Sequence, residues 1–289
     1  MTLSASTAAP RDARSGAPLG DLHARTALVA LALVREAPGS GGRGALLRAL
    51  RDRPGADAAI LLADADAETR ALAQGAIALC ARQPDRASWV VPTIVEQFPA
   101  SLTLQEDGVA WALLPARRAD EAGRATTAAA LRVAARLGAR TAVGLSPFVT
   151  GPERLHDALR QARIVLELTC GGEVDVEEAT TGTWRLLLAM AVCDPDELAA
   201  CIASSIGPAL EYDARLRTEV VPTFRAYLDH GANMNATAAA IYAHRHTVAA
   251  RLERLGALTR LDPMRHDDRE RLGLGVKAQV VLDALAEVR

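Results

Sequence analysis

Apolar positions between residues 58 and 168 alternate between short runs and helical spacing. The first half contains an apolar run at 58–63, a helical stretch at about 65–81, extended segments near 88–104 and a strand at 109–114. A helix at about 119–137, a strand at 141–145 and a helix at about 152–168 follow. This alternation is typical of a compact α/β domain.

The remainder of the chain has a helical pattern. Helix-like stretches at 21–35 and 43–53 are separated by the breaker Pro38-Gly39-Ser40-Gly41-Gly42. Helices are also predicted at 184–192, at 196–206 and before Leu228, where Pro222 should begin or kink the last one. The pattern predicts a mostly helical α+β chain, with an α/β domain followed by an all-helical domain.

Changes of composition suggest where these parts begin and end. Residues 1–20 are rich in Ser, Ala, Pro and Gly and lack the basic start of a secretory signal, which indicates a disordered tail. We expect a helical segment at 21–54, the α/β domain at 55–172, an acidic, turn-rich linker at 173–183 and the helical domain at 184–289.

Composition narrows the function. Hydrophobic residues make up 50% of the chain but aromatic residues only 3%, which favours an Ala-, Leu- and Val-rich helical core. A net charge of −2 means that any DNA-binding surface is local. No apolar run reaches the length of a membrane span, so we expect a cytoplasmic protein. The four widely spaced cysteines, with no metal-ligand pattern, predict no metal or cofactor: Cys80, Cys170, Cys193 and Cys201.

Residues 235–255 have the pattern of a helix-turn-helix. Two short helices flank a turn at about 242–244, with a small residue where the helices cross. Asn235 is expected to cap the first helix, and Ala238 to lie at the crossing. An apolar stripe completes the packing set, which comprises Asn235, Ala238, Ile241, Val248, Leu252 and Leu255.

The second helix carries the candidate DNA-binding residues. Arg245 can bond two atoms of a guanine edge, whereas Arg251 and Arg254 are expected to contact the phosphate backbone. The proposed set is His244, Arg245, His246, Thr247, Ala249, Ala250, Arg251 and Arg254. A metal site at His244 and His246 is disfavoured because positions i and i+2 of a helix face different ways; a pH-sensing role is a further alternative.

The segment from Phe224-Arg-Ala-Tyr-Leu-Asp-His-Gly-Ala-Asn233 to His244-Arg-His-Thr-Val-Ala-Ala-Arg-Leu-Glu-Arg-Leu255 resembles the carboxyl-terminal domain of the PucR/CdaR family of bacterial transcription regulators. The resemblance implies double-stranded DNA as partner. The chain departs from the family pattern at His246, Ala249 and Ala250, so its operator preference should differ from that of relatives.

The same resemblance implies a degenerate GGDEF-like domain upstream, because Thr141-Ala-Val-Gly-Leu-Ser and Leu155-His-Asp-Ala-Leu-Arg-Gln-Ala-Arg are similar to its last strand and helix. The Asp107-Gly108 pair predicts a hairpin at the position of the GGDEF signature. That hairpin, Gln105-Glu-Asp-Gly-Val-Ala-Trp111, lacks the glycine pair and the trailing acid, so no enzymatic activity and no catalytic residue are expected.

The leading hypothesis is a homodimeric transcriptional regulator whose recognition helix enters the major groove, with an unknown small-molecule effector. The alternative is a ligand- or nucleotide-binding regulatory module whose helix-turn-helix serves protein interaction. A nucleotidyl cyclase is disfavoured by the hairpin.

Overall fold

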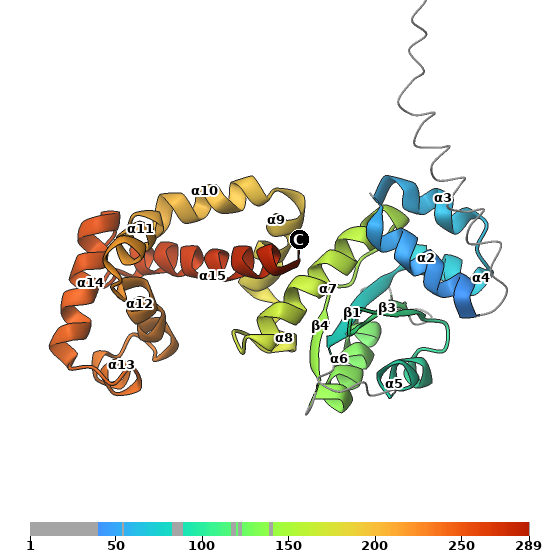
Figure 1. Cartoon of the computed structure of the whole chain (residues 1–289), viewed down its shortest axis with the longest axis horizontal. Coiled ribbons are helices and arrows are strands. Elements are labelled where there is room, and N and C mark those ends of the chain that lie inside the picture. Colours follow the sequence, from blue (N-terminus) through green and yellow to red (C-terminus); the bar gives the residue numbers. More distant parts are fainter. Residues whose placement is uncertain are drawn as a thin grey trace, which may run out of the picture.

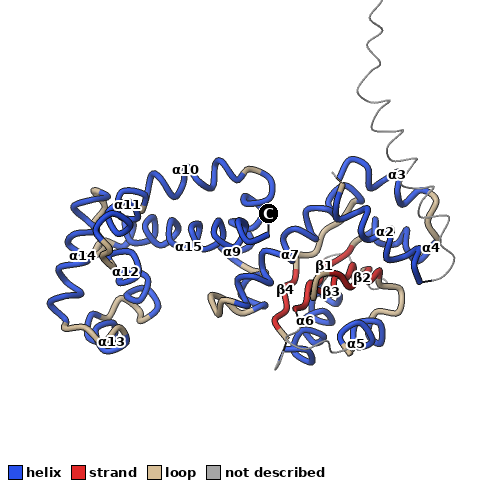
Figure 2. Tube along the Cα trace, viewed as in Figure 1, coloured by secondary structure: helices blue, strands red, loops and turns tan. Residues whose placement is uncertain are grey.

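A computed structural model describes residues 40–53, 55–82, 89–116, 120, 123–138 and 141–288. It is mostly helical, with one four-stranded antiparallel sheet confined to one of two lobes (Figure 2). The predicted tail at 1–20 and the helix at 21–35 lie outside the described residues.

The sheet of the first lobe has the order β2-β3-β1-β4, and every neighbouring pair is antiparallel. With the intervening helices this is a β-α-β-β-α-β arrangement. The strands are β1 (Ala76–Arg82), β2 (Leu102–Glu106), β3 (Val109–Pro115) and β4 (Ala142–Leu145). The Asp107-Gly108 hairpin between β2 and β3 is confirmed, and both residues have positive φ (52° and 74°), as a two-residue turn of this kind requires.

Helices cover both faces of the sheet (Figure 1). One face packs on α5 (Val90–Gln97) and α6 (Arg124–Gly138). The other packs on α2 (Ser40–Asp52), α3 (Ala58–Ala63) and α7 (Leu155–Cys170). Short helical turns complete the lobe: η1 (Gly55–Asp57), α4 (Ala67–Arg70), η2 (Ala71–Gln74) and η3 (Pro152–Arg154).

Gly144 explains how closely β4 approaches α7. A Cβ at this position would lie 2.1 Å from the carbonyl oxygen of Ala162 and 2.3 Å from the amide nitrogen of Leu166. Backbone atoms of a packed helix cannot move aside as a flexible side chain can, so only glycine allows this strand and helix to pack together.

The second lobe is entirely helical. After α8 (Val176–Ala179), capped by Asp175, it contains α9 (Gly182–Cys193), α10 (Pro195–Ser205), α11 (Gly207–Leu216), α12 (Val220–Asp229), α13 (Met234–Ala240), α14 (Arg245–Thr259) and α15 (His266–Val288). Pro222 lies in the first turn of α12, so the prediction that a helix begins near it is confirmed.

Two long helices join the lobes. Helix α15 packs on α9, α10 and α12 and also on α7 of the first lobe. Ile164, Val165 and Leu168 of α7 belong to the core of the helical lobe, whereas Leu159 and Leu166 belong to the core beneath the sheet. The carboxyl-terminal end of α15 therefore lies where the lobes meet (Figure 1).

Two expectations for the first lobe are wrong in part. The apolar run at 58–63, to which the sequence pattern gave no secondary structure, is helix α3, and the helix predicted at 65–81 ends at Gln74 and is followed by β1. Strand β1 is buried on both faces, so its apolar residues do not alternate, and its alanines favour a helical prediction. The segment near 88–104 contains α5, whose β-branched residues suggested a strand.

The breaker at 38–42 also ends earlier than expected, because α2 already begins at Ser40. Glycines are tolerated in a first turn, where the N–H groups have no helical partner. None of the described helices is long and apolar enough to cross a bilayer.

Candidate nucleic-acid interface

Asn233, rather than Asn235, caps the first helix of the helix-turn-helix. Gly231 and Ala232 both have positive φ (62° and 61°) and end the preceding helix. The chain is then extended at Asn233, whose side-chain oxygen accepts the N–H groups of Asn235 (3.0 Å) and Ala236 (3.1 Å). Asn235 is exposed inside the first turn, so the expected cap is wrong by two residues.

The turn between α13 and α14 contains Tyr242 in a left-handed conformation (φ 52°). The Ala243 N–H donates to the Ala238 carbonyl (2.9 Å), and the Tyr242 N–H donates to that of Ala239 (3.3 Å), which closes the helix end. The Tyr242 side chain is 98% exposed. The sequence interpretation missed this residue; the available signal was a large aromatic residue in a short polar turn.

The interior of the motif is tightly packed. Val248, Leu252 and Leu255 of α14 are buried, and Ala238 lies beside them with 7% exposure. Ile241 is partly buried against the same core. Thr237, which the sequence did not single out, is fully buried, and its hydroxyl donates to the Asn233 carbonyl (2.8 Å). This packing fixes the direction of α14.

The amino-terminal end of α14 projects into solvent. His244 caps the helix, with its Nδ1 accepting the N–H of His246 (3.3 Å), and the two imidazole rings stack at 5.0 Å. Arg245, His246 and Thr247 are all exposed. Among the described residues, the Arg245 guanidinium has neither an ion pair nor a hydrogen bond. This end therefore offers free donors to an external acceptor.

Arg251 is held within the protein. Its guanidinium donates to the Thr223 hydroxyl (3.0 Å) and to the Glu219 carboxylate (2.8 Å), both on or beside α12, and its side chain is 28% exposed. Both interactions occupy the guanidinium that was expected to contact a DNA phosphate, and that contact stays a prediction. Arg251 positions α14 against α12.

The other candidate residues flank the exposed end. The Arg254 guanidinium lies over the Tyr212 ring of α11, 5.5 Å from its centroid. Ala250 is exposed, and Ala249 is partly buried. A groove of about 390 Å³ separates α14 from the α11–α12 loop, and Arg217, Arg251 and Arg254 line it. Glu219, the partner of Arg251, also lines this groove, so Arg217 and Arg254 are its cationic side chains without a carboxylate partner among the described residues.

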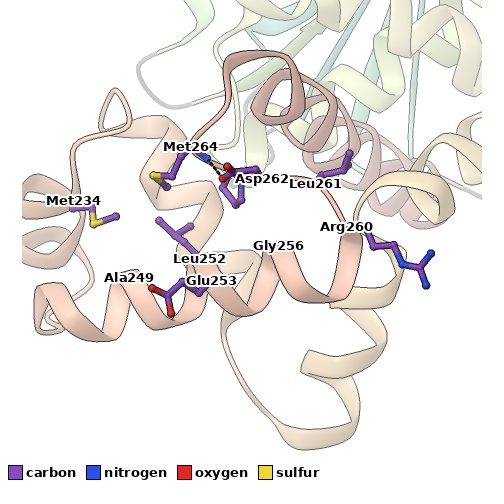
Figure 3. A pocket seen from close by; sticks show the side chains of 10 residues that line it. Met234, Ala249, Leu252, Glu253, Gly256, Arg260, Leu261, Asp262 and Met264 are labelled. Carbon is purple, nitrogen blue, oxygen red and sulfur yellow. Dashed lines mark hydrogen bonds between the residues drawn. The ribbon is translucent and has the colours of Figure 1, made fainter.

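A second groove, of about 490 Å³, runs along the opposite flank of α14 and is mostly apolar (Figure 3). Met234, Leu252 and Met264 point into it, and Glu253 and Arg260 lie along α14 at its rim. Met264 is 46% exposed.

In the described part of the chain, neither lobe contains a group of three or more His, Cys, Asp or Glu residues placed to hold a metal ion. The four cysteines are free thiols. The β2–β3 hairpin has Asp107-Gly108 at its tip.

Comparison with protein families gives two matches. The PucR C-terminal helix-turn-helix domain matches residues 220–278, and the GGDEF-like domain matches residues 21–168. No curated protein matches the chain significantly. Among solved structures, a regulator of polyketide synthase expression from Bifidobacterium adolescentis is similar, with 15% identity over 86% of this chain and 96% of that chain and a TM-score of 0.43.

Proposed function

Because the chain belongs to the PucR/CdaR type of transcriptional regulators, with a GGDEF-like domain before a PucR helix-turn-helix, we propose that it binds DNA sequence-specifically. Helix α14 enters the major groove with its amino-terminal end first. The observation that carries this is the exposed first turn of α14: Arg245 has no partner in the described protein, while Val248 and Leu252 anchor the same helix.

The candidate residues have different roles in this proposal. Arg245 reads a base edge, since an exposed and unpaired guanidinium can make two parallel bonds to guanine. His246, Thr247 and Tyr242 lie beside it and contact bases or backbone. The His244 backbone, Ala249 and Ala250 allow close approach of the DNA surface.

Arg254 and Arg217 are proposed to contact phosphates across the groove between α14 and the α11–α12 loop. Arg251 acts by holding α14 on α12 through Glu219 and Thr223. In the same proposal residues 184–289 form the DNA-binding domain and 55–172 the regulatory domain, joined by 173–183. Two copies of the chain bind half-sites about 34 Å apart as a homodimer.

Fluorescence anisotropy with duplexes from the regulator's own upstream region tests the function. We expect saturable binding that weakens steeply with salt, with Arg254→Ala reducing the slope of log K against log salt by about 1. The matched control is Arg132→Gln, at an exposed position of α6 in the other lobe. It should leave the affinity for DNA unchanged. Absence of any salt-sensitive binding by the wild type would refute the proposal.

The apolar groove beside α14 supports a second candidate, in which the helix-turn-helix binds a protein. Met264→Glu places a charge in that groove without touching the first turn of α14. Loss of DNA binding in Arg245→Ala but not in Met264→Glu favours the DNA function. Absence of DNA binding by the wild type, together with binding of a protein that Met264→Glu abolishes and Arg245→Ala does not, favours the protein-interaction candidate.

A further inference from the structure

A pocket of about 430 Å³ lies where the two lobes meet. One wall is formed by α2, by Trp111 of β3 and by α7; the other is formed by Leu285 and Val288, in the last turns of α15. Its volume falls within the range of small-molecule sites. It combines residues of the sheet lobe with the end of the long helix.

Arginines dominate the polar part of this pocket. Arg51, Arg160 and Arg163 line it, against Asp52 and the exposed hairpin residue Asp107. Arg160 has no ion pair or hydrogen bond among the described residues. It is therefore free to bind an anion that enters the pocket.

The other two arginines are paired. Arg51 donates to both carboxylate oxygens of the adjacent Asp52, and the remaining carboxylates are each shared by two arginines. The Glu167 carboxylate serves both Arg163 and Arg82, and the Glu106 carboxylate serves both Arg51 and Arg48. The Arg163 side chain is 14% exposed. Burial lowers the pKa of its guanidinium, and the nearby charge of Arg82 lowers it further. Because Arg160 has no carboxylate partner among the described residues and Glu167 is shared by two arginines, the positive charge at the Arg160–Arg163 side of the pocket is incompletely neutralised.

The pocket also has an unsatisfied polar atom and an apolar side. The Nδ1 atom of His156 is buried without a hydrogen-bond partner, which is costly unless a ligand or water completes it. The Arg51 guanidinium lies 5.1 Å from the centroid of the Trp111 ring, and the apolar side chains of Leu285 and Val288 also line the pocket. Together these side chains offer an apolar contact surface to a flat group.

We propose that this pocket binds a small organic anion, with a carboxylate or phosphate on Arg160, Arg163 and His156 and an apolar body between Trp111 and the end of α15. The site is an effector site. Helix α15 has 23 residues, about 34 Å at 1.5 Å per residue. Its amino-terminal half packs against α12, which in turn packs against α14 of the helix-turn-helix. A ligand in the pocket fixes the lobes and hence the setting of α14.

Direct binding to the full chain is the first test and needs no DNA. Phenyl phosphate and benzoate are titrated by calorimetry. Two fragments serve as comparison: inorganic phosphate, which has only the anionic group, and phenol, which has only the aromatic ring. We expect one of the two aromatic anions to bind at least 10-fold more tightly than either fragment, and which of the two binds identifies the anionic group. Equal affinity for a fragment, or no binding of either aromatic anion, overturns the assignment.

Matched variants locate the site. Arg160→Gln and Trp111→Leu should each weaken binding at least 10-fold, whereas Arg132→Gln on the other face of the sheet should not change it. Arg160 makes no ion pair or hydrogen bond among the described residues, so Arg160→Gln should test the site without unfolding the protein, and an unchanged urea midpoint checks this. Unchanged binding by Arg160→Gln overturns the proposal.

The regulatory part rests on the proposed DNA function. Saturation with the bound anion should change the affinity of the wild type for DNA at least 5-fold, and this change should be absent in Arg160→Gln. Anion binding without any effect on DNA affinity would refute the effector role. Failure of DNA binding itself, with anion binding intact, would refute only the function proposed above.

Discussion

Two arginine-rich regions of the molecule differ in how their charges are compensated. At the exposed end of α14, Arg245 is free of partners in the described protein and fully available to solvent. At the junction of the lobes, Arg163 is 14% exposed and shares the Glu167 carboxylate with Arg82. The first region is open, whereas the second is enclosed.

This difference indicates what each region can bind. Exposed, unpaired guanidinium groups remain hydrated and therefore have no desolvation penalty. They suit an extended polyanion that releases counterions on binding. Buried guanidinium groups require carboxylates of their own and can accommodate only a small additional anion. In the two proposals, the same residue type therefore serves DNA recognition in one lobe and ligand recognition at the junction.

The largest expected effect comes from breaking the enclosed region. Glu167→Gln leaves the buried Arg163 and its neighbour Arg82 without their common carboxylate, which should lower the free energy of unfolding by about 3 kcal/mol. Urea denaturation measures it. Glu96→Gln removes an exposed partner of Arg136 and should cost no more than about 0.5 kcal/mol. Equal losses in the two variants would contradict the comparison.

The open region should respond in binding rather than in stability. Arg245→Ala should weaken specific DNA binding by about 2 kcal/mol, or about 30-fold. Its urea midpoint should stay at the wild-type value because the side chain contacts nothing in the described fold. A shifted midpoint would show that Arg245 is a structural residue.

Arg251 lies between the two cases, since it belongs to α14 but is paired internally. Arg251→Ala removes two hydrogen bonds to α12 and should lower stability by about 1 kcal/mol, with a loss of DNA affinity smaller than that of Arg245→Ala. Thermal unfolding and anisotropy on the same samples measure both quantities. If the variant were as stable as the wild type but no longer bound DNA, the account would be contradicted and Arg251 would be a direct DNA contact.

The smallest effect is a pH dependence of the enclosed region. The hydrogen bond from Arg51 holds the pKa of the Glu106 carboxyl below its ordinary value. A lowered pKa stabilises the folded state above the unfolded value, about 4.3, and this contribution is lost as the pH falls through the folded pKa. The difference in melting temperature between wild type and Glu106→Gln should therefore narrow from pH 7 to pH 4. A difference that widens on acidification would contradict this assignment.

The helix-turn-helix could be predicted from sequence because its determinants are local. The small crossing residue Ala238 and the stripe through Val248, Leu252 and Leu255 lie within 20 residues, and a long family signature covers them. The cap was misplaced because Asn233 and Asn235 are both suitable capping residues. The left-handed conformation of Gly231 and Ala232, which ends the preceding helix, places Asn233 at the cap.

The features that the sequence did not reveal depend on distant partners. The internal pairing of Arg251 involves residues 28 and 32 positions away, and the junction pocket combines α2, α7 and the end of α15. Strand β1 was hidden because a strand buried on both faces shows no alternation. The local sequence pattern therefore predicted the helix-turn-helix better than it predicted the first lobe.

Selection of binding sites from random duplexes tests the central claim most directly. The wild type should enrich an inverted repeat with half-sites one helical turn apart, and Arg245→Ala should lose the preference at one base pair of each half-site while keeping the rest. Enrichment of the same sequence by both proteins, or of none by the wild type, would contradict base reading by the exposed end of α14.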